Sequence, residues 1–336
     1  LTTLGGAGAF PETEAQWLRY MGKAGGEAIA ASDLLLAVGT CLPETANYGR
    51  LQNFAVNDEG RQVILVEPDA AAVGVNRPVD LALIGQVDLV LAQLLEAVGD
   101  GSAFKEHAEL DKWRNASKAE DKALTDNLPR SNRLHPGHLM LEARRAVPED
   151  AVIVVDGGLT MLYQYAFFEK RSSEFIYTAN FGHLGSGIGL AIGAQLAAGR
   201  TRPVFLITGD GALGFHIMDF ETAVRHRLPI VIVLNDDQAL GAEMAQHMQH
   251  IGHEIQVAFS PVNYAAMAEA MGGFGIRVER REDIAAAIED AFGQAAAHNK
   301  PAIVQVSTDQ DASHTYPVPY VGELAGWKEA DVLARI

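Results

Sequence analysis

The sequence is poor in the features that mark disulfide-rich, membrane-spanning or nucleic-acid-binding proteins. Cys41 is the single cysteine, so no intrachain disulfide can form. We find no apolar run long enough to span a bilayer, and no basic region precedes the first apolar stretch as in a signal peptide. The 26 Lys and Arg residues are outnumbered by 43 Asp and Glu, giving a net charge of −17 that argues against nucleic acid as a partner. We expect a cytoplasmic globular protein.

The first third of the chain has the alternation of a parallel α/β domain. Apolar runs at Leu34–Val38, Val63–Val66 and Leu81–Ile84 are predicted to be buried strands. In Val87–Val98 apolar residues recur at spacings of three and four, which predicts a helix. This βαβ pattern is typical of a parallel sheet.

A polar stretch from Gly99 to Arg133 separates two such series. Helical character is predicted from Ala103 to Ala123, and Pro129 and Pro136 end any helix there. In the second series we predict strands at Val152–Val155, Val204–Thr208, Ile230–Leu234, Ile276–Val278 and Ala302–Val306, and helices at Ile188–Ala198, Asp219–His226, Tyr264–Met271 and Ile284–Ala297.

Polar side chains follow two of these strands. Gly209-Asp210-Gly211 ends one strand, a predicted helical crossover at Ala212–Leu228 follows, and Asn235-Asp236 ends the next. Ligands of open parallel sheets lie beyond the carboxyl ends of the strands, and Mg²⁺ commonly takes one or two carboxylates plus phosphate oxygens. A magnesium–phosphate site is therefore predicted, the alternative being two unrelated turns, since both sequences are common in turns.

The segment VFLITGDGALGFHIMDFETAVRHRLPIVIVLND resembles the diphosphate-binding motif of the thiamine-diphosphate enzymes related to acetolactate synthase, pyruvate oxidase and benzoylformate decarboxylase. The resemblance implies that the side chains of Asp210 and Asp236 and the backbone carbonyl of Gln238 bind Mg²⁺. Asp236 departs from the family pattern, in which asparagine is usual. The cofactor-binding residues implied are Gly209, Asp210, Gly211, Ala212, Asp236 and Gln238.

Two further segments match the same family. Phe181–Gly187 resembles the segment that holds the cofactor in a bent conformation, which implies that Leu184 wedges between the two rings and that the Gly182 carbonyl accepts a hydrogen bond from the pyrimidine amino group. Without the Gly-Asp-Gly motif, a glycine-rich helix start would explain this segment. Gly157 and Gly158 match a strand end whose backbone contributes to the cofactor site, although a generic turn explains them nearly as well.

The resemblance implies an α/β architecture of two doubly wound parallel-sheet domains, the first incomplete. Residues 1–99 would be the latter part of the central domain, 100–132 a helical linker, 133–307 the diphosphate- and Mg²⁺-binding domain, and 308–336 a tail or lid. Gly5–Gly8 would lie in the central domain, which binds FAD in the oxidases of the group and no cofactor in most decarboxylases.

The expected activity is decarboxylation of a 2-oxo acid with protonation or carboligation, dependent on thiamine diphosphate and Mg²⁺. In this family a pyrimidine-binding domain supplies an activating glutamate. We therefore expect that domain to come from the same or another chain, in a homodimer or homotetramer. Without it, we expect no activity. The alternative is a non-catalytic nucleotide-binding α/β module. His247, His250 and His253 invite a metal-site interpretation, whereas the family implies that one of them or Glu243 touches substrate.

Overall fold

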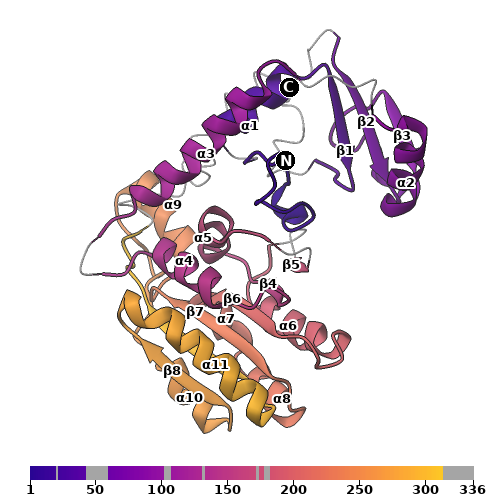
Figure 1. Cartoon of the computed structure of the whole chain (residues 1–336). Coiled ribbons are helices and arrows are strands. Elements are labelled where there is room, and N and C mark those ends of the chain that lie inside the picture. Colours follow the sequence, from indigo (N-terminus) through magenta and orange to yellow (C-terminus); the bar gives the residue numbers. More distant parts are fainter. Residues whose placement is uncertain are drawn as a thin grey trace. The chain divides into compact units, whose positions relative to one another are not determined.

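The computed structural model describes residues 1–19, 22–42, 60–101, 107–130, 133–171, 174–177 and 182–312 (Figure 1). These residues form two compact units. The first comprises residues 1–6 and 15–122, and the second comprises residues 7–14 and 123–312. The domain limits predicted near residues 99 and 133 stay predictions. Phe181 and most of the predicted tail lie outside the described residues.

The first unit contains a three-stranded parallel sheet. Its strands are β1 (Leu34–Val38), β2 (Gln62–Glu67) and β3 (Leu81–Ile84), in the order β1-β2-β3, and helix α2 is Val87–Val98. The central strand β2 buries Val63, Leu65 and Val66. The strands are confirmed, but the prediction that they are buried is wrong for β1 and β3, where Leu34, Leu36, Leu81 and Ile84 are about half exposed.

Helices α1 (Lys23–Ala31) and α3 (Leu110–Asp126) complete this unit, with short 3₁₀ turns η1 (Leu4–Gly6) and η4 (Ala70–Ala72). Contacts to α3 hold the N-terminal segment, because Arg19 pairs with Asp121 and the Ala24 N–H donates to Glu120 Oε1 at 3.0 Å. Trp113 of α3 is buried. Helix α3 ends at Asp126, three residues beyond the predicted end; the predicted start lies outside the described residues.

The second unit is built on a six-stranded parallel sheet in the order β5-β4-β6-β7-β9-β8. The chain runs from β4 to β5 on one side and then returns through α6 to β6 on the other side of β4. The strand order therefore reverses between β4 and β6, where open α/β sheets form a crevice. The strands are β4 (Val152–Val155), β5 (Phe175–Tyr177), β6 (Val204–Gly209), β7 (Ile230–Asp236), β8 (Phe274–Val278) and β9 (Ala302–Ser307).

Helices cover both faces of this sheet, as doubly wound folds require. Alternate residues of each strand face opposite layers: Ile153 and Val155 pack with α4, α5 and α11, whereas Val152 and Val154 pack on the other face with α6, α8 and α10. The helices are α4 (Pro136–Ala146), α5 (Leu159–Phe167), α6 (Ser186–Ala197), α7 (Asp210–His216), α8 (Asp219–Arg225), α9 (Gly241–Ile251), α10 (Tyr264–Ala270) and α11 (Ile284–His298), with a 3₁₀ turn η5 (Arg281–Asp283).

The α/β parallel-sheet class is confirmed, with two local differences. The crossover contains an additional helix, α7, before α8, which corresponds to the predicted helix Asp219–His226, and strand β7 continues through Asp236 because that residue pairs with Ser307 of β9. The three-residue strand β5 was too short to give a periodic signal.

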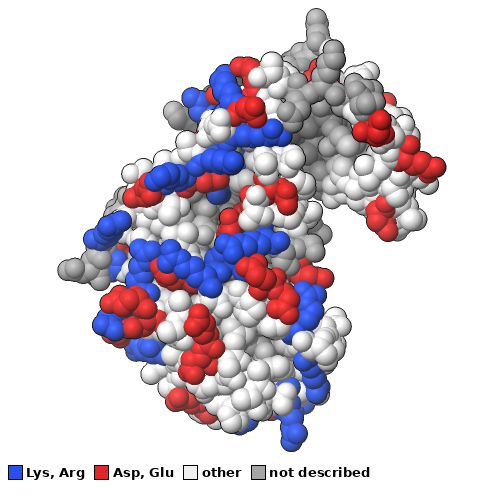
Figure 2. Space-filling model, in the orientation of Figure 1, with Lys and Arg blue, Asp and Glu red and all other residues white. Residues whose placement is uncertain are grey.

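Charged side chains of opposite sign lie next to one another over much of the face in Figure 2. Among the described ion pairs, Arg171 Nη1 lies 2.9 Å from Glu149 Oε1. Within the described ranges, none of the helices combines the length and apolarity of a transmembrane segment.

Candidate functional site

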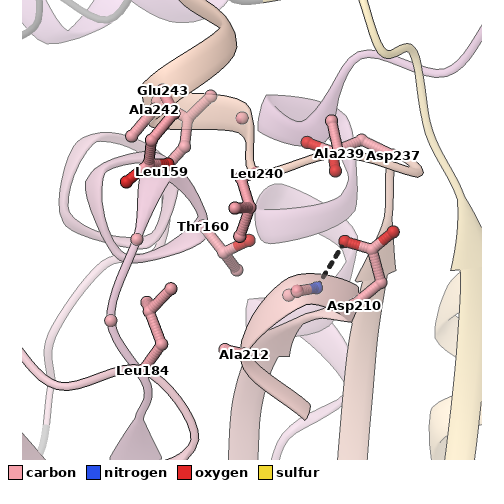
Figure 3. Close-up of a pocket in the computed structure, with 15 residues that line it drawn as sticks. Leu159, Thr160, Leu184, Asp210, Ala212, Asp237, Ala239, Leu240, Ala242 and Glu243 are labelled. Carbon is pink, nitrogen blue, oxygen red and sulfur yellow. Dashed lines mark hydrogen bonds between the residues drawn. The ribbon is translucent and has the colours of Figure 1, made fainter. Parts of the chain in front are cut away.

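A cavity open to solvent lies at the carboxyl ends of β4, β6 and β7, where the strand order reverses (Figure 3). Its wall is mostly glycine backbone and small apolar side chains, with carboxylates on two sides. The lining residues are Gly157, Gly158, Leu159, Thr160, Leu184, Gly209, Asp210, Gly211, Ala212, Asp237, Ala239, Leu240, Gly241, Ala242 and Glu243.

The first turns of α5, α7 and α9 converge on this cavity. Leu159 and Thr160 begin α5, Asp210 begins α7, and Gly241 begins α9. The first N–H groups of a helix have no partner within the helix, and they attract anions. The cavity is therefore suited to a group rich in phosphate oxygens.

Two buried carboxyl groups form one end of the cavity. Asp210 accepts a hydrogen bond from the Gly211 N–H at 2.7 Å, and the carboxyl groups of Asp210 and Asp237 are in hydrogen-bonding contact. Burial, and then repulsion from Asp236, raises the pKa of Asp210 to about 7. Burial and the nearby Asp210 raise the pKa of Asp237 well above its ordinary value. Such a pair binds a proton or a cation readily, because either relieves the repulsion.

Asp236 and Gln238, the two other predicted metal ligands, lie outside the lining of the cavity, although the Asp236 carboxyl also interacts with that of Asp210. Asp236 Oδ2 accepts from Gln305 Nε2 at 2.7 Å, and its Oδ1 is buried without a hydrogen-bond partner. The Gln238 carbonyl already accepts from the Phe259 N–H at 2.7 Å and from Gln310 Nε2 at 2.8 Å. Neither residue lines the cavity, whereas the following residues Asp237 and Ala239 do.

Strand alternation explains this one-residue difference. Because β7 includes Asp236, that side chain continues the face of Ile232 and Leu234. Asn235 points to the opposite face, where its Nδ2 donates to Thr160 Oγ1 at 3.1 Å and its Oδ1 accepts from Thr308 Oγ1 at 2.8 Å. If the predicted strand had ended at Asp236 rather than before it, the sequence would have indicated Asp237 as the candidate metal ligand.

Leu184 lies across the cavity from Asp210 and Asp237 in Figure 3. Its Cδ2 is 3.1 Å from where a Cβ would stand on Gly157 and 3.3 Å from where one would stand on Gly158. Gly158 also has a φ of +79°, which favours glycine. The two glycines therefore allow the leucine to lie directly on the end of β4. Gly182 precedes it with a φ of +60°, and its carbonyl oxygen is 3.2 Å from the Gly157 Cβ position.

Of the four candidate side chains in α9 and just after it, one lies at the cavity and three lie elsewhere. Glu243 lines the cavity. His247 Nδ1 accepts from the Ile255 N–H at 3.2 Å, and His253 Nδ1 lies 3.1 Å from the Ile251 carbonyl oxygen. His250 is exposed and is not among the lining residues. In the part of the chain that the structure describes, no three His, Cys, Asp or Glu side chains group closely enough to hold a metal ion.

A divalent cation fits this site if other ligands complete its coordination. Asp210 and Asp237 supply two carboxylates that are buried and repel each other. The Ala239 carbonyl oxygen lies on the same side, 3.5 Å from the Gly211 Cβ position. Mg²⁺ often takes its remaining ligands from phosphate and water, which the N–H-lined cavity can accommodate.

Comparison with known proteins agrees with this geometry. Residues 156–306 match the family "Thiamine pyrophosphate enzyme, C-terminal TPP binding domain", and residues 1–94 match "Thiamine pyrophosphate enzyme, central domain". The first match covers β6, β7 and the starts of α5, α7 and α9 around the cavity, and the second covers the three-stranded sheet.

Individual relatives are distant but extend over most of the chain. The acetolactate synthase large subunit of Haemophilus influenzae is 25% identical over 331 residues, covering 96% of this chain and 56% of the relative. A putative thiamine pyrophosphate-containing protein, YdaP, of Bacillus subtilis is 28% identical, with 91% and 51% covered. The sulfoacetaldehyde acetyltransferase of Castellaniella defragrans is 25% identical, with 89% and 54% covered. The chain thus spans about half the length of these relatives.

Proposed function

Because the chain belongs to the thiamine pyrophosphate enzymes, through their central and C-terminal domains, we propose that its cavity holds the diphosphate end of thiamine diphosphate together with Mg²⁺. One observation carries this proposal: the buried pair Asp210 and Asp237 faces Leu184 across a cavity lined with glycine backbone and helix starts. A negatively charged ligand would be repelled by these carboxylates alone, so a divalent cation has to accompany it.

In this proposal Asp210, Asp237 and the Ala239 carbonyl hold the metal, in place of the set Asp210, Asp236 and Gln238. The shift by one residue keeps the order of ligand types, namely two side chains followed by a carbonyl two residues after the second. It is supported by the hydrogen bonds that already occupy Asp236 Oδ2 and the Gln238 carbonyl.

The remaining wall serves the rest of the cofactor. The N–H groups at the beginnings of α5 and α9 donate to the diphosphate oxygens. Leu184 would contact the rings of the cofactor from the opposite side, and the Gly182 carbonyl would accept a hydrogen bond from its pyrimidine amino group. Gly157, Gly158, Gly209, Gly211 and Ala212 leave room for the backbone to approach the ligand.

The reaction we propose is decarboxylation of a 2-oxo acid followed by protonation or carboligation, as in acetolactate synthase-like enzymes. Bound thiamine diphosphate supplies an electron sink for the bond to the lost carboxyl group. This chain contributes the metal, the diphosphate contacts and an apolar wall that excludes water. We propose that a pyrimidine-binding domain, from a longer form of this chain or from another chain in a homodimer or homotetramer, completes the site.

Calorimetric titration with thiamine diphosphate tests the proposal. Binding should require Mg²⁺ and should be lost in Asp210→Ala. Asp290→Ala, a change of an exposed acid on α11, is the matched control and should bind like the wild type. Equal binding with and without Mg²⁺, or preferential binding of ATP over thiamine diphosphate, would instead support the non-catalytic nucleotide-binding module.

A further inference from the structure

Asp156 is a buried carboxylate at the strand end whose glycines, Gly157 and Gly158, are matched to the cofactor site from the sequence. It follows the last residue of β4 and is 2% exposed. Its Oδ1 accepts from the N–H groups of Gly157 at 2.8 Å and Gly185 at 3.0 Å. Its Oδ2 accepts from the Gly187 N–H and from Thr208 Oγ1, both at 3.2 Å.

These four bonds join three separate parts of the site. Gly157 belongs to the end of β4, Thr208 lies on β6, and Gly185 and Gly187 enclose the beginning of α6. The two loop bonds therefore attach residues 182–187 to the sheet. The contact is close, because a Cβ on Gly187 would stand 2.7 Å from Asp156 Oδ2.

The attached loop carries Leu184. That side chain lies on Gly157 and Gly158, directly beside the carboxylate's own strand end. The distance from the metal-binding end of the cavity to Leu184 thus depends on how firmly the loop is held against β4. Among the described residues, Asp156 is the side chain that accepts from both the Gly185 and Gly187 N–H groups.

A carboxylate is needed for this arrangement. Ionised Asp offers two acceptor oxygens and no donor, so it can serve all four donors at once. Asparagine at the same place keeps one acceptor oxygen and presents an NH₂ group to the remaining donors. Burial raises the pKa of Asp156, whereas its hydrogen bonds act in the opposite direction and favour the ionised form.

We propose that Asp156 is a positioning residue of the cofactor site, which by holding residues 182–187 against the ends of β4 and β6 places Leu184 at the depth where it contacts the rings of the cofactor. The inference rests on the proposed function for the identity of the ligand. Its first part, the anchoring of the loop, is independent of any ligand.

Hydrogen–deuterium exchange of the full chain without ligand tests the anchoring. In Asp156→Asn, peptides covering residues 182–188 should exchange about tenfold faster or more, because the amide cannot accept from both Gly185 and Gly187. Thr208→Val removes one bond to the carboxylate and leaves both loop bonds, so the same peptides should exchange as in the wild type. Unchanged exchange in Asp156→Asn would overturn the proposal.

Binding selectivity separates positioning from a general structural role. With Mg²⁺ present, the Kd of thiamine diphosphate should rise about tenfold in Asp156→Asn, whereas that of inorganic pyrophosphate should change by less than about twofold, since pyrophosphate has no rings to meet Leu184. Equal weakening for both ligands would show that Asp156 only supports the fold, and would refute the proposal.

A double-mutant cycle links the effect to Leu184. If Asp156 acts through that side chain, Leu184→Ala and Asp156→Asn should each lower the preference for thiamine diphosphate over pyrophosphate, and the double variant should lower it no further than Leu184→Ala alone. Additive losses would contradict the proposal. Failure of the wild type to bind either ligand would refute the proposed function itself, a result distinct from all of these.

Discussion

The sharpest prediction concerns the neighbouring residues Asp236 and Asp237. We expect Asp237→Ala to abolish most Mg²⁺-dependent binding of thiamine diphosphate, and Asp236→Ala to leave it nearly unchanged. The reason is their orientation: Asp237 lines the cavity in contact with Asp210, whereas Asp236 Oδ2 is bound by Gln305.

The expected magnitudes follow from the contacts. Two unit charges about 4 Å apart interact by roughly 4 kcal/mol at an effective dielectric constant near 20. The attraction between the doubly charged Mg²⁺ and Asp237 is therefore roughly 8 kcal/mol, and about half of this offsets the repulsion between Asp237 and Asp210. Desolvation reduces the remainder, leaving about 3 kcal/mol, or about a hundredfold in Kd. Asp236→Ala leaves Gln305 Nε2 its second acceptor, the Val262 carbonyl at 2.7 Å, so a change below about threefold is expected.

Isothermal titration of thiamine diphosphate over a series of Mg²⁺ concentrations measures both variants, with circular dichroism to show that they are folded. Asp237→Asn should recover most of the affinity, because its amide oxygen can still bind the metal. If Asp236→Ala loses binding while Asp237→Ala retains it, the orientation argument is refuted and the assignment to Asp236 is restored.

Further predictions can be checked by thermal or denaturant unfolding. Gly185→Ala should destabilise the folded protein by about 3 kcal/mol, since the φ of Gly185 is +88° and an added Cβ would lie no farther than 3.0 Å from three neighbouring atoms. Gly193→Ala should instead stabilise the folded protein by about 0.5 kcal/mol, because Gly193 lies inside α6 with nothing within 4 Å of the added Cβ. The pKa of Asp210 is about 7 in the folded state and 3.8 ordinarily, so between these pH values the native state binds more protons than the unfolded state. Without divalent cations, the free energy of unfolding should therefore fall as the pH rises from about 4 to 7. An increase in the free energy of unfolding over this range would contradict the prediction. Lys170→Met should cost about 3 kcal/mol by leaving Glu12 buried without its cation, 3.2 Å away, and adding Glu12→Gln should recover part of the loss; no recovery would argue against the pair.

Much of the second unit was predictable because its signals are local. Strands β4, β6 and β7 begin with uninterrupted apolar runs, and the apolar run of β9 is interrupted only by Gln305, as expected for strands buried on both faces. The family resemblance, confirmed by the two matching domains, likewise depends on short contiguous motifs. These features place Asp210 at a strand end and Leu184 near the start of a helix without any knowledge of packing.

The roles of individual acids were harder to predict because they depend on distant partners. Asp156 gives no pattern of its own, and its importance becomes visible only when the loop at Gly185 and the strand at Thr208 come together around it. Glu243 similarly reaches the cavity only because α9 begins beside the starts of α5 and α7.

The sequence by itself determined the order of strands and helices, the parallel sheets and the edge at which a polyanion and a metal would meet, since apolar periodicity and glycine placement act over a few residues. Tertiary structure decided which carboxylate faces the cavity. Pairing with β9 extends β7 through Asp236, and that long-range backbone contact turns Asp236 toward Gln305 and leaves Asp237 beside Asp210. Because side chains alternate along a strand, one residue of added pairing is enough to exchange the two.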